Sequence, residues 1–148
     1  MSLNNIRTEI KALLETVPGI GKVHDFERWT IDWQKFLEFF KTADNKINGW
    51  TITRSVSTEN NQSVGTNIRT HQILIKGYYG LKDAVESEKA FQNLIEAVCD
   101  VLRSHNDLNA SCLKSGPPQV SKVYPRPFGG VLVHVCNIQL AVQERIQI

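Results

Sequence analysis

The strongest strand pattern in the chain lies near its end, from Val131 to Gln143. Its first six residues read Val-Leu-Val-His-Val-Cys, so a strand here is apolar on both faces. Beyond Cys136 apolar and polar residues alternate, which indicates that one face of the strand turns to water. Such a strand needs strands beside it. The preceding Gly129-Gly130 suits a tight hairpin turn, because glycine adopts positive φ angles freely. The segment therefore predicts a sheet.

Three further segments have strand patterns. A short strand from Gln119 to Tyr124 precedes the glycine turn, and strands from Ile47 to Ser57 and from Ile68 to Tyr79 form a second hairpin. In the first of these, alternation places Trp50, Ile52 and Val56 on one face. The connection from Ser57 to Asn67 is rich in Ser, Thr, Asn and Gly, which predicts a long, solvated and mobile loop. The residues from Gly21 to Trp29 are expected to form a short strand or an extended segment.

Three segments have helical periodicity: Leu3 to Thr16, Thr30 to Lys41 and Asp83 to His105. Asp83 and Glu86 are spaced like a capping box at the start of the third. The expected buried residues of the second helix are Trp33, Phe36, Leu37 and Phe40, and those of the third are Ala84, Phe91, Ile95, Val98, Cys99 and Leu102. Helices and hairpins in this order predict an α+β fold, with an antiparallel sheet of four or more strands and helices packed on one face.

Composition limits the domain count and the partners. The chain has 148 residues, enough for a single domain over 1–148 with a real core. Its 17 basic and 15 acidic residues leave a net charge of +2, too little for a general nucleic-acid footprint. It contains no apolar run near the ~20 residues that a membrane helix needs, and its first residues do not form a signal peptide. We therefore expect a soluble, cytoplasmic protein.

The sequence contains no recognisable pattern of catalytic residues. The glycines around Lys22 lack the spacing of a phosphate loop, and they follow a helix instead of a strand. His24-Asp25 does not fit a metal site, because only three other histidines exist and the pair lies on a segment that is expected to be extended instead of helical. The three cysteines, Cys99, Cys112 and Cys136, are widely spaced and suit buried reduced thiols. We therefore predict no catalytic, cofactor-binding or metal-binding residues, no cofactor, and a protein that is not an enzyme.

Candidate interface residues fall in two places. Ile31 and Phe39 lie off the apolar stripe of the second helix, so one core cannot easily bury both sets. Arg126 and Phe128 belong to a stretch that mixes basic and aromatic side chains, as protein interfaces and single-strand binders both do. The weak net charge favours a protein partner. A nucleic-acid-binding accessory protein and a small enzyme remain the alternatives.

The order of these segments resembles a known family. The sequence is similar, over most of its length, to the small tail terminator or tail completion proteins of tailed bacteriophages and prophages. The similarity is carried by a first helix ending in Val17-Pro18-Gly19-Ile20-Gly21, by His24-Asp25-Phe26-Glu27-Arg28-Trp29, by Gly49-Trp50-Thr51-Ile52-Thr53-Arg54 at the start of a hairpin, by Leu94-Ile95-Glu96-Ala97-Val98 in a helix, and by a valine-rich final strand.

This resemblance implies an α+β protein that assembles into a homo-hexameric ring. Such a ring caps the tail tube, stops its polymerisation and forms the surface on which head and tail dock. The partners implied are other copies of the chain and the tube and neck proteins of the virion. The location implied is the cytoplasm of a bacterial host during assembly, and afterwards the tail.

Overall fold

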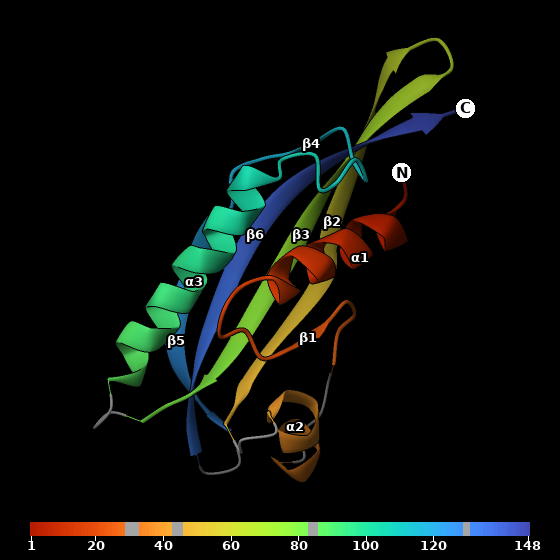
Figure 1. Cartoon of the computed structure of the whole chain (residues 1–148). Coiled ribbons are helices and arrows are strands. Elements are labelled where there is room, and N and C mark those ends of the chain that lie inside the picture. The colour runs from red at the N-terminus through yellow and green to blue at the C-terminus, as the bar shows by residue number, and fades with distance from the viewer. Residues whose placement is uncertain (29–32, 43–45, 83–85, 129–130) are drawn as a thin grey trace.

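The computed structural model describes residues 1–28, 33–42, 46–82, 86–128 and 131–148; the side chains of residues 33 and 128 are also outside the description. Helices and strands follow one another as in Figure 1. In chain order they are α1 (Leu3–Glu15), β1 (Lys22–His24), α2 (Trp33–Phe40), β2 (Asn48–Ser63), β3 (Thr66–Gly80), α3 (Ser87–Ser104), β4 (Lys114–Ser115), β5 (Gln119–Phe128) and β6 (Val131–Gln147).

The strands form one six-stranded sheet in the order β1-β2-β3-β6-β4, with β5 also paired to β6. The β2–β3, β3–β6 and β5–β6 pairs are antiparallel, which confirms the two predicted hairpins. β1 pairs with β2 in parallel, and Val23 lies opposite Trp50. The sheet is therefore mixed, and the prediction of a purely antiparallel sheet is wrong at this edge. β1 and β2 are parallel because the chain crosses over through α2 and returns beside β1 in the same direction.

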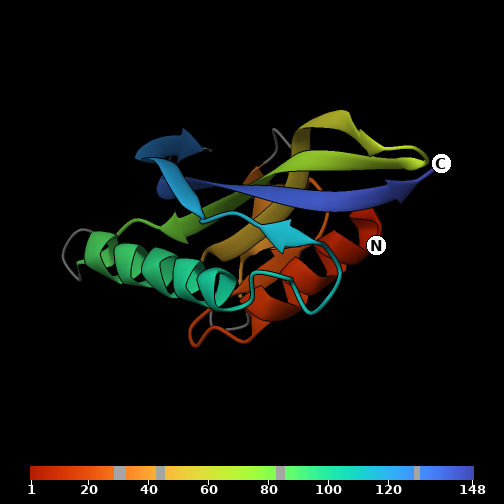
Figure 2. The ribbon, with the colours of Figure 1, turned by 90° about the horizontal axis from the view of Figure 1, so that it is seen from above.

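The main core lies between the sheet and the helices α1 and α3, which pack side by side on one face (Figure 2). We call this the α1–α3 face. Its centre is Trp50, whose ring lies over Gly77 on the neighbouring strand; a Cβ at Gly77 would overlap that ring. The predicted stripe of α3 is buried here through Phe91, Ile95, Val98, Cys99 and Leu102, whereas Ala84 lies outside the described residues.

A second, smaller core lies on the opposite face, which we call the α2 face. Phe36 and Phe40 of α2 pack against Tyr78 of β3, with ring centroids 5.5 and 4.7 Å apart. Val133 and Val135 of β6 complete this cluster. The prediction that helices cover only one face is therefore wrong, because α2 covers the other. The apolar pattern on both faces at the start of β6 reflects these two cores.

The segment from Ser57 to Asn67, predicted as a long mobile loop, is instead strand on both sides of a short turn. β2 continues to Ser63 and β3 begins at Thr66, and Gly65 adopts a φ of +80° at the turn. A β-bulge between Arg54 and Val56 also shifts the alternation of β2. Val56 consequently does not share the face of Trp50 but is 56% exposed.

Three other boundaries differ from the sequence prediction, and one of them is the end of β6, which lies at Gln147 instead of Gln143. α3 begins at Ser87, with Glu86 at its N-cap position in the left-handed region (φ 55°), so the expected capping box is absent there; Asp83 lies outside the described residues. β5 runs on past Tyr124 to Phe128 and includes Pro125 and Pro127. Both prolines are tolerated because β5 lies at an edge, where a strand needs hydrogen-bond donors on one side only.

Replacing Ile95 with Ala should reduce the free energy of unfolding by about 2–5 kcal/mol, because the side chain is fully buried beneath α3. The neighbouring Glu96 is exposed, so Glu96→Ala serves as a control that should change it by less than about 0.5 kcal/mol. Urea unfolding of both variants measures the difference. Equal, small effects in the two variants would contradict the assignment of this stripe to the core.

Candidate protein interface

The three central strands continue beyond the helices as an arm (Figure 1). We define the arm as residues 57–71 of β2 and β3 together with residues 143–148 at the end of the chain. At its base Ser57 pairs with His71, and His71 pairs with Val142; the β3–β6 register is continuous along the arm, whereas the β2–β3 register shifts once, between Asn61 and Ser63. At the tip, the N–H of Ile148 donates to the carbonyl of Gly65 over 2.8 Å. All three strands are thus held together along the arm.

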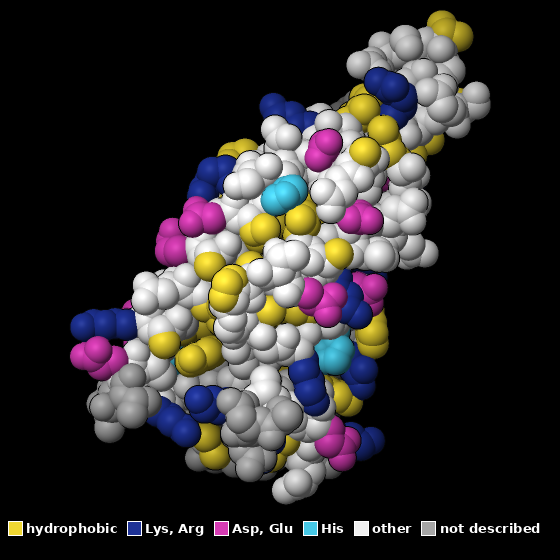
Figure 3. All heavy atoms as spheres, viewed as in Figure 1, with side chains coloured by type: hydrophobic (Ala, Val, Ile, Leu, Met, Phe, Trp, Pro, Cys, Tyr) yellow, Lys and Arg dark blue, Asp and Glu magenta, His cyan; other side chains and the backbone are white. Residues whose placement is uncertain are grey.

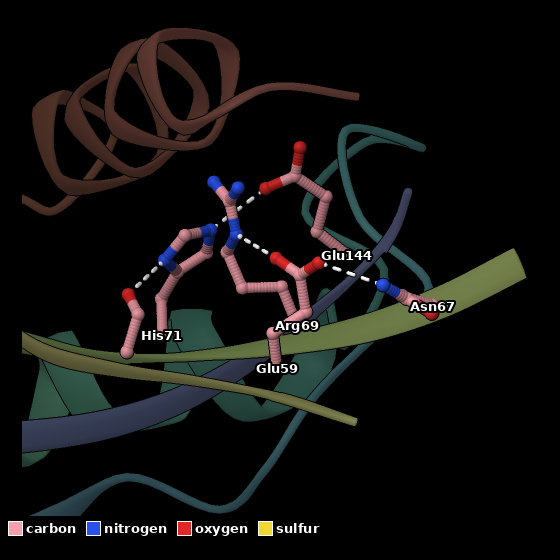
Figure 4. A network of polar contacts seen from close by, with 6 residues as sticks. Glu59, Asn67, Arg69, His71 and Glu144 are labelled. Carbon is pink, nitrogen blue, oxygen red and sulfur yellow. Dashed lines mark hydrogen bonds and ion pairs between the residues drawn. The ribbon is translucent and has the colours of Figure 1, made fainter. Parts of the chain in front are cut away.

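The base of the arm is tied by a buried polar triplet (Figure 4). His71 Nε2 lies 2.7 Å from Glu144 Oε2, and the exposed fractions of their side chains are 0% and 6%. The other ring nitrogen, Nδ1, lies 2.6 Å from the hydroxyl of Ser57. One residue from each of β2, β3 and β6 takes part, so the triplet joins all three strands where the apolar core ends.

A second polar network runs along the exposed part of the arm (Figure 4). Arg69 Nε donates to one carboxylate oxygen of Glu59 over 3.0 Å, and Asn67 Nδ2 donates to the other over 2.8 Å. The Asn67 and Arg69 hydrogen bonds lower the pKa of Glu59, so this carboxylate stays ionised. Asn61 extends the network by donating to the Asn67 side-chain oxygen over 2.9 Å. Cross-strand polar pairs therefore support strands that have little apolar surface to bury.

The surface of the arm is largely uncharged beyond this network. Figure 3 shows its outer part covered mainly by uncharged polar side chains, with an apolar side chain at the end. Val64 at the tip is fully exposed, and Ile148 beside it is 80% exposed. Exposed backbone edges and apolar tips are features by which a sheet recruits another chain. The arm can therefore bind a protein through its main chain and its tip.

Ser57, His71 and Glu144 have the residue types of a hydrolytic triad, but their burial favours a structural role. A serine-histidine-acid triad needs an imidazole that can pass a proton to a substrate beside it. Here the His71 ring is fully buried, and both its nitrogens are engaged within the sheet. The triplet therefore holds the arm in place.

The two predicted interface residues whose side chains the structure describes, Phe39 and Arg126, lie on the α2 face instead of on the arm. Phe39 is half-buried at the edge of the smaller core, and the guanidinium of Arg28 lies 3.9 Å from its ring centroid. Its carbonyl is 2.8 Å from His24 Nε2, which fastens the end of α2 to β1. Arg126 is exposed on β5, opposite Val133. Phe39 and Arg126 therefore lie on the same side of the sheet.

The remaining two predicted residues are described only in part. Ile31 lies outside the described residues, and for Phe128 only the backbone is described, opposite Val131. Whether any of the four contacts a partner stays a prediction. The arm itself was missed as an interface because its Ser, Thr and Asn residues match a loop as well as a polar strand. The one sequence signal is that Glu59 and Arg69, of opposite charge, flank the turn at Gly65 at positions that pair across the strands.

A hollow lined by several titratable side chains lies at the opposite end of the sheet, between the start of α3 and β5. It measures about 330 Å³ and is lined in part by Tyr124, Glu88 and His134. His134 Nε2 is 2.9 Å from the Ser87 hydroxyl, which also accepts the N–H of Lys82 over 2.8 Å. Burial lowers the pKa of His134, so its ring is neutral at neutral pH. The contact between His134 and Ser87 closes the turn before α3. If the protein were an enzyme, these two side chains would be its candidate catalytic groups.

The cysteines are buried, free thiols, as predicted. Burial raises the pKa of Cys112 to about 11 and that of Cys136 to about 12, and it also raises the pKa of Cys99. Thiolates are the reactive form, so these side chains behave as apolar residues. Within the described part of the chain, no group of three or more His, Cys, Asp or Glu side chains is placed to hold a metal ion.

Comparison of the sequence with protein-family models and with curated proteins finds no match. Among the residues that the structure covers, no helix is long and apolar enough to cross a membrane.

Removing one partner of the His71–Glu144 pair should be far more damaging than removing both. His71→Leu leaves a buried carboxylate without its partner and should cost about 3–5 kcal/mol of unfolding free energy. The double variant His71→Leu/Glu144→Met removes both polar groups, so it should recover most of that loss. Denaturant unfolding of the two single variants and the double variant measures the coupling. Additive losses would show that the two side chains do not act as a pair.

Stability should fall at alkaline pH because several buried groups resist ionisation in the folded state. Burial raises the pKa of Tyr78 to about 12, from an ordinary value of 10.0, and that of Cys136 to about 12, from 9.0. The unfolded chain ionises first, so the contribution to stability is complete below about pH 9 and is lost as pH rises towards 12. Unfolding curves at about pH 8 and about pH 11 should show this loss, and Tyr78→Phe should reduce it. An unchanged pH dependence in Tyr78→Phe would exclude Tyr78 as a source.

Proposed function

We propose that this protein is a structural component of a phage tail, which assembles into a ring and caps the tail tube. The observation that carries the proposal is the arm, which projects beyond the core and is held rigid by polar pairs instead of apolar burial. A rigid arm with free strand edges has a cost in the free subunit, since such edges invite aggregation. That cost is understandable in a subunit whose arm is covered by neighbours after assembly.

Ring closure requires two different surfaces that fit each other. The arm provides one. The α2 face provides the second candidate, because Phe39 under Arg28 and the exposed Arg126 add partly exposed aromatic and arginine side chains to the smaller core. Aromatic and arginine side chains are enriched at protein interfaces. A head-to-tail contact between the arm of one copy and the α2 face of the next would generate a closed ring, and we expect a hexamer from the family resemblance.

The charge distribution supports a protein partner over nucleic acid. The net charge is only +2. On the exposed part of the arm, the positive charge of Arg69 is paired with the carboxylate of Glu59. Nucleic-acid binding depends on concentrated positive charge along a face. The proposed partners are therefore further copies of the chain, the end of the tail tube and a neck protein. The proposed location is the host cytoplasm during assembly and then the virion.

The proposal is tested by electron microscopy of the concentrated protein, alone and with purified tail tubes. Wild-type protein should form rings and bind tube ends. Val64→Asp places a charge at the fully exposed tip of the arm and should abolish both without loss of stability. Val120→Asp is the matched control, because this valine is 42% exposed on β5, away from the arm, and its change should leave rings intact. Rings that persist in Val64→Asp, or their absence in the wild type with and without tubes, would overturn the proposal.

A further inference from the structure

The outer edge of β2 is open along most of its length. β1 pairs with β2 only from Gly49 to Thr51, whereas β2 continues to Ser63. Beyond Thr51, no strand among the described residues pairs with that side of β2. Every second residue along such an edge leaves its N–H and C=O without a strand partner. β2 contains neither proline nor lysine. It therefore lacks two of the residue types that commonly prevent an edge strand from pairing with another chain.

The other edges of the same sheet are poor partners for it. β1 and β4 contain only three and two residues, and within the described chain the outer edge of β6 is open only for the four residues from Glu144 to Gln147 beyond its pairing with β4. β5 is longer, but Pro125 and Pro127 cannot donate hydrogen bonds on its outer side, and Lys122 and Arg126 add charge there. Within this chain, the strand best able to complete the β2 edge is therefore β2 itself, in a second copy.

We propose that two copies pair antiparallel along their β2 edges, with Thr58 facing Thr58 on the two-fold axis. Side chains that face each other must lie on the same side of the joined sheet, so the axis must pass through a residue and not between two. An axis at Glu59 would set two carboxylates against each other. An axis at Thr58 sets Thr against Thr, Ser57 against Glu59, and Val56 against Asn60. This register opposes no like charges, and it leaves five regularly paired residues, Val56 to Asn60, between the bulges of the two copies, whereas an axis at Ser57 would leave only three.

The bulge in β2 adds charge complementarity to this register. Because Ser55 is the extra residue, Arg54 pairs with Ile73 and shares the α1–α3 face with Ser57 and Glu59. In the paired edges Arg54 then lies opposite Asn61 of the second copy and diagonal to its Glu59. Long side chains reach such diagonal neighbours. Arg54 is exposed and has no ion pair within the described residues, so it is available to the second copy's carboxylate. The contact occurs twice by symmetry.

This two-fold contact goes beyond the proposed function. A ring requires a head-to-tail contact between different surfaces, whereas the β2 edge meets an identical edge and closes on itself as a pair. The paired state would cover the open edge of the arm in the protein before it meets a partner. The inference does not depend on a phage role, because it rests only on the strand edge.

Single-cysteine crosslinking tests the pairing in the full chain. The three native thiols are buried and give little background. In an antiparallel pair, facing Cα atoms are about 4.5–5.5 Å apart, within the range of about 4.4–6.8 Å that a disulfide spans. Thr58→Cys should therefore oxidise to a covalent dimer. Val56→Cys and Asn60→Cys are exposed controls on the same face, each about 13 Å from its own symmetry mate. They should crosslink on the order of tenfold less alone, but readily when the two variants are mixed.

A charge reversal provides an independent readout. Arg54→Glu places two carboxylates near each other across the pair and should raise the dimer dissociation constant on the order of tenfold in sedimentation experiments. Lys35→Glu, an equal change of charge at an exposed position on α2, should leave the constant unchanged. Each variant is first checked for a native circular dichroism spectrum. Equal crosslinking at positions 56, 58 and 60, or a wild-type protein that remains monomeric with no Thr58→Cys crosslink, would overturn the proposal.

Discussion

The pairing of β3 with β6 is the constraint on which the rest of the molecule depends. It runs without interruption from Gly80 opposite Val133 to Thr66 opposite Gln147. Because successive side chains of a strand point to opposite faces, this one ladder places apolar side chains on both sides of the sheet at one end. Val133 and Val135 face α2, while Cys136 and Ile138 face α1 and α3. Both cores are therefore positioned by the same strands.

The same ladder carries the arm past the end of the core. Once the helices end, the strands keep their pairing but lose the apolar cover that stabilises it elsewhere. Polar side chains replace that cover in two steps, first the buried His71–Glu144 pair and then the exposed network around Glu59. A buried ionisable pair contributes less stability than apolar packing of equal volume, so its presence points to another role, such as specifying register.

The sequence predicts the core elements well because their apolar periodicity is strong. The stripe containing Ile95 is buried, and both predicted hairpins form; at the start of β6, residues 133–136 are buried, whereas Val131 and Leu132 are 44% and 48% exposed. For β1 the sequence predicts a short strand or an extended segment without deciding between them, because three residues show no period, and the parallel pairing of β1 depends on where α2 returns the chain. The placement of α2 on the opposite face could not be read from its own stripe. An amphipathic stripe indicates that a helix is buried but does not say on which side of a sheet.

The candidate site was harder to predict because its stabilising contacts are polar and lie far apart in the sequence. Glu59 and Arg69 read separately as residues of a solvated loop, and only the register of the hairpin shows that they face each other. The bulge at Ser55 has no signature in the residues around it, yet it decides which side chains share a face with Arg54. For the α2 face, the position of Phe39 off the apolar stripe of its helix predicts a residue outside the core. Its half-burial under Arg28 shows that such a residue can be both core and surface.

The buried polar pair at the base of the arm fixes the register of strands whose outer parts are polar. Uncharged polar strands such as the outer parts of β2 and β3 can slip by one residue at little cost, since neither face is strongly preferred. A slip of one residue would move His71 to the opposite face of the sheet and leave Glu144 buried alone. The penalty for that state is several times larger than any loss among exposed Ser, Thr and Asn residues. The pair therefore confines the arm to one register, and with it the pattern of side chains that the open edge of β2 presents to a second chain.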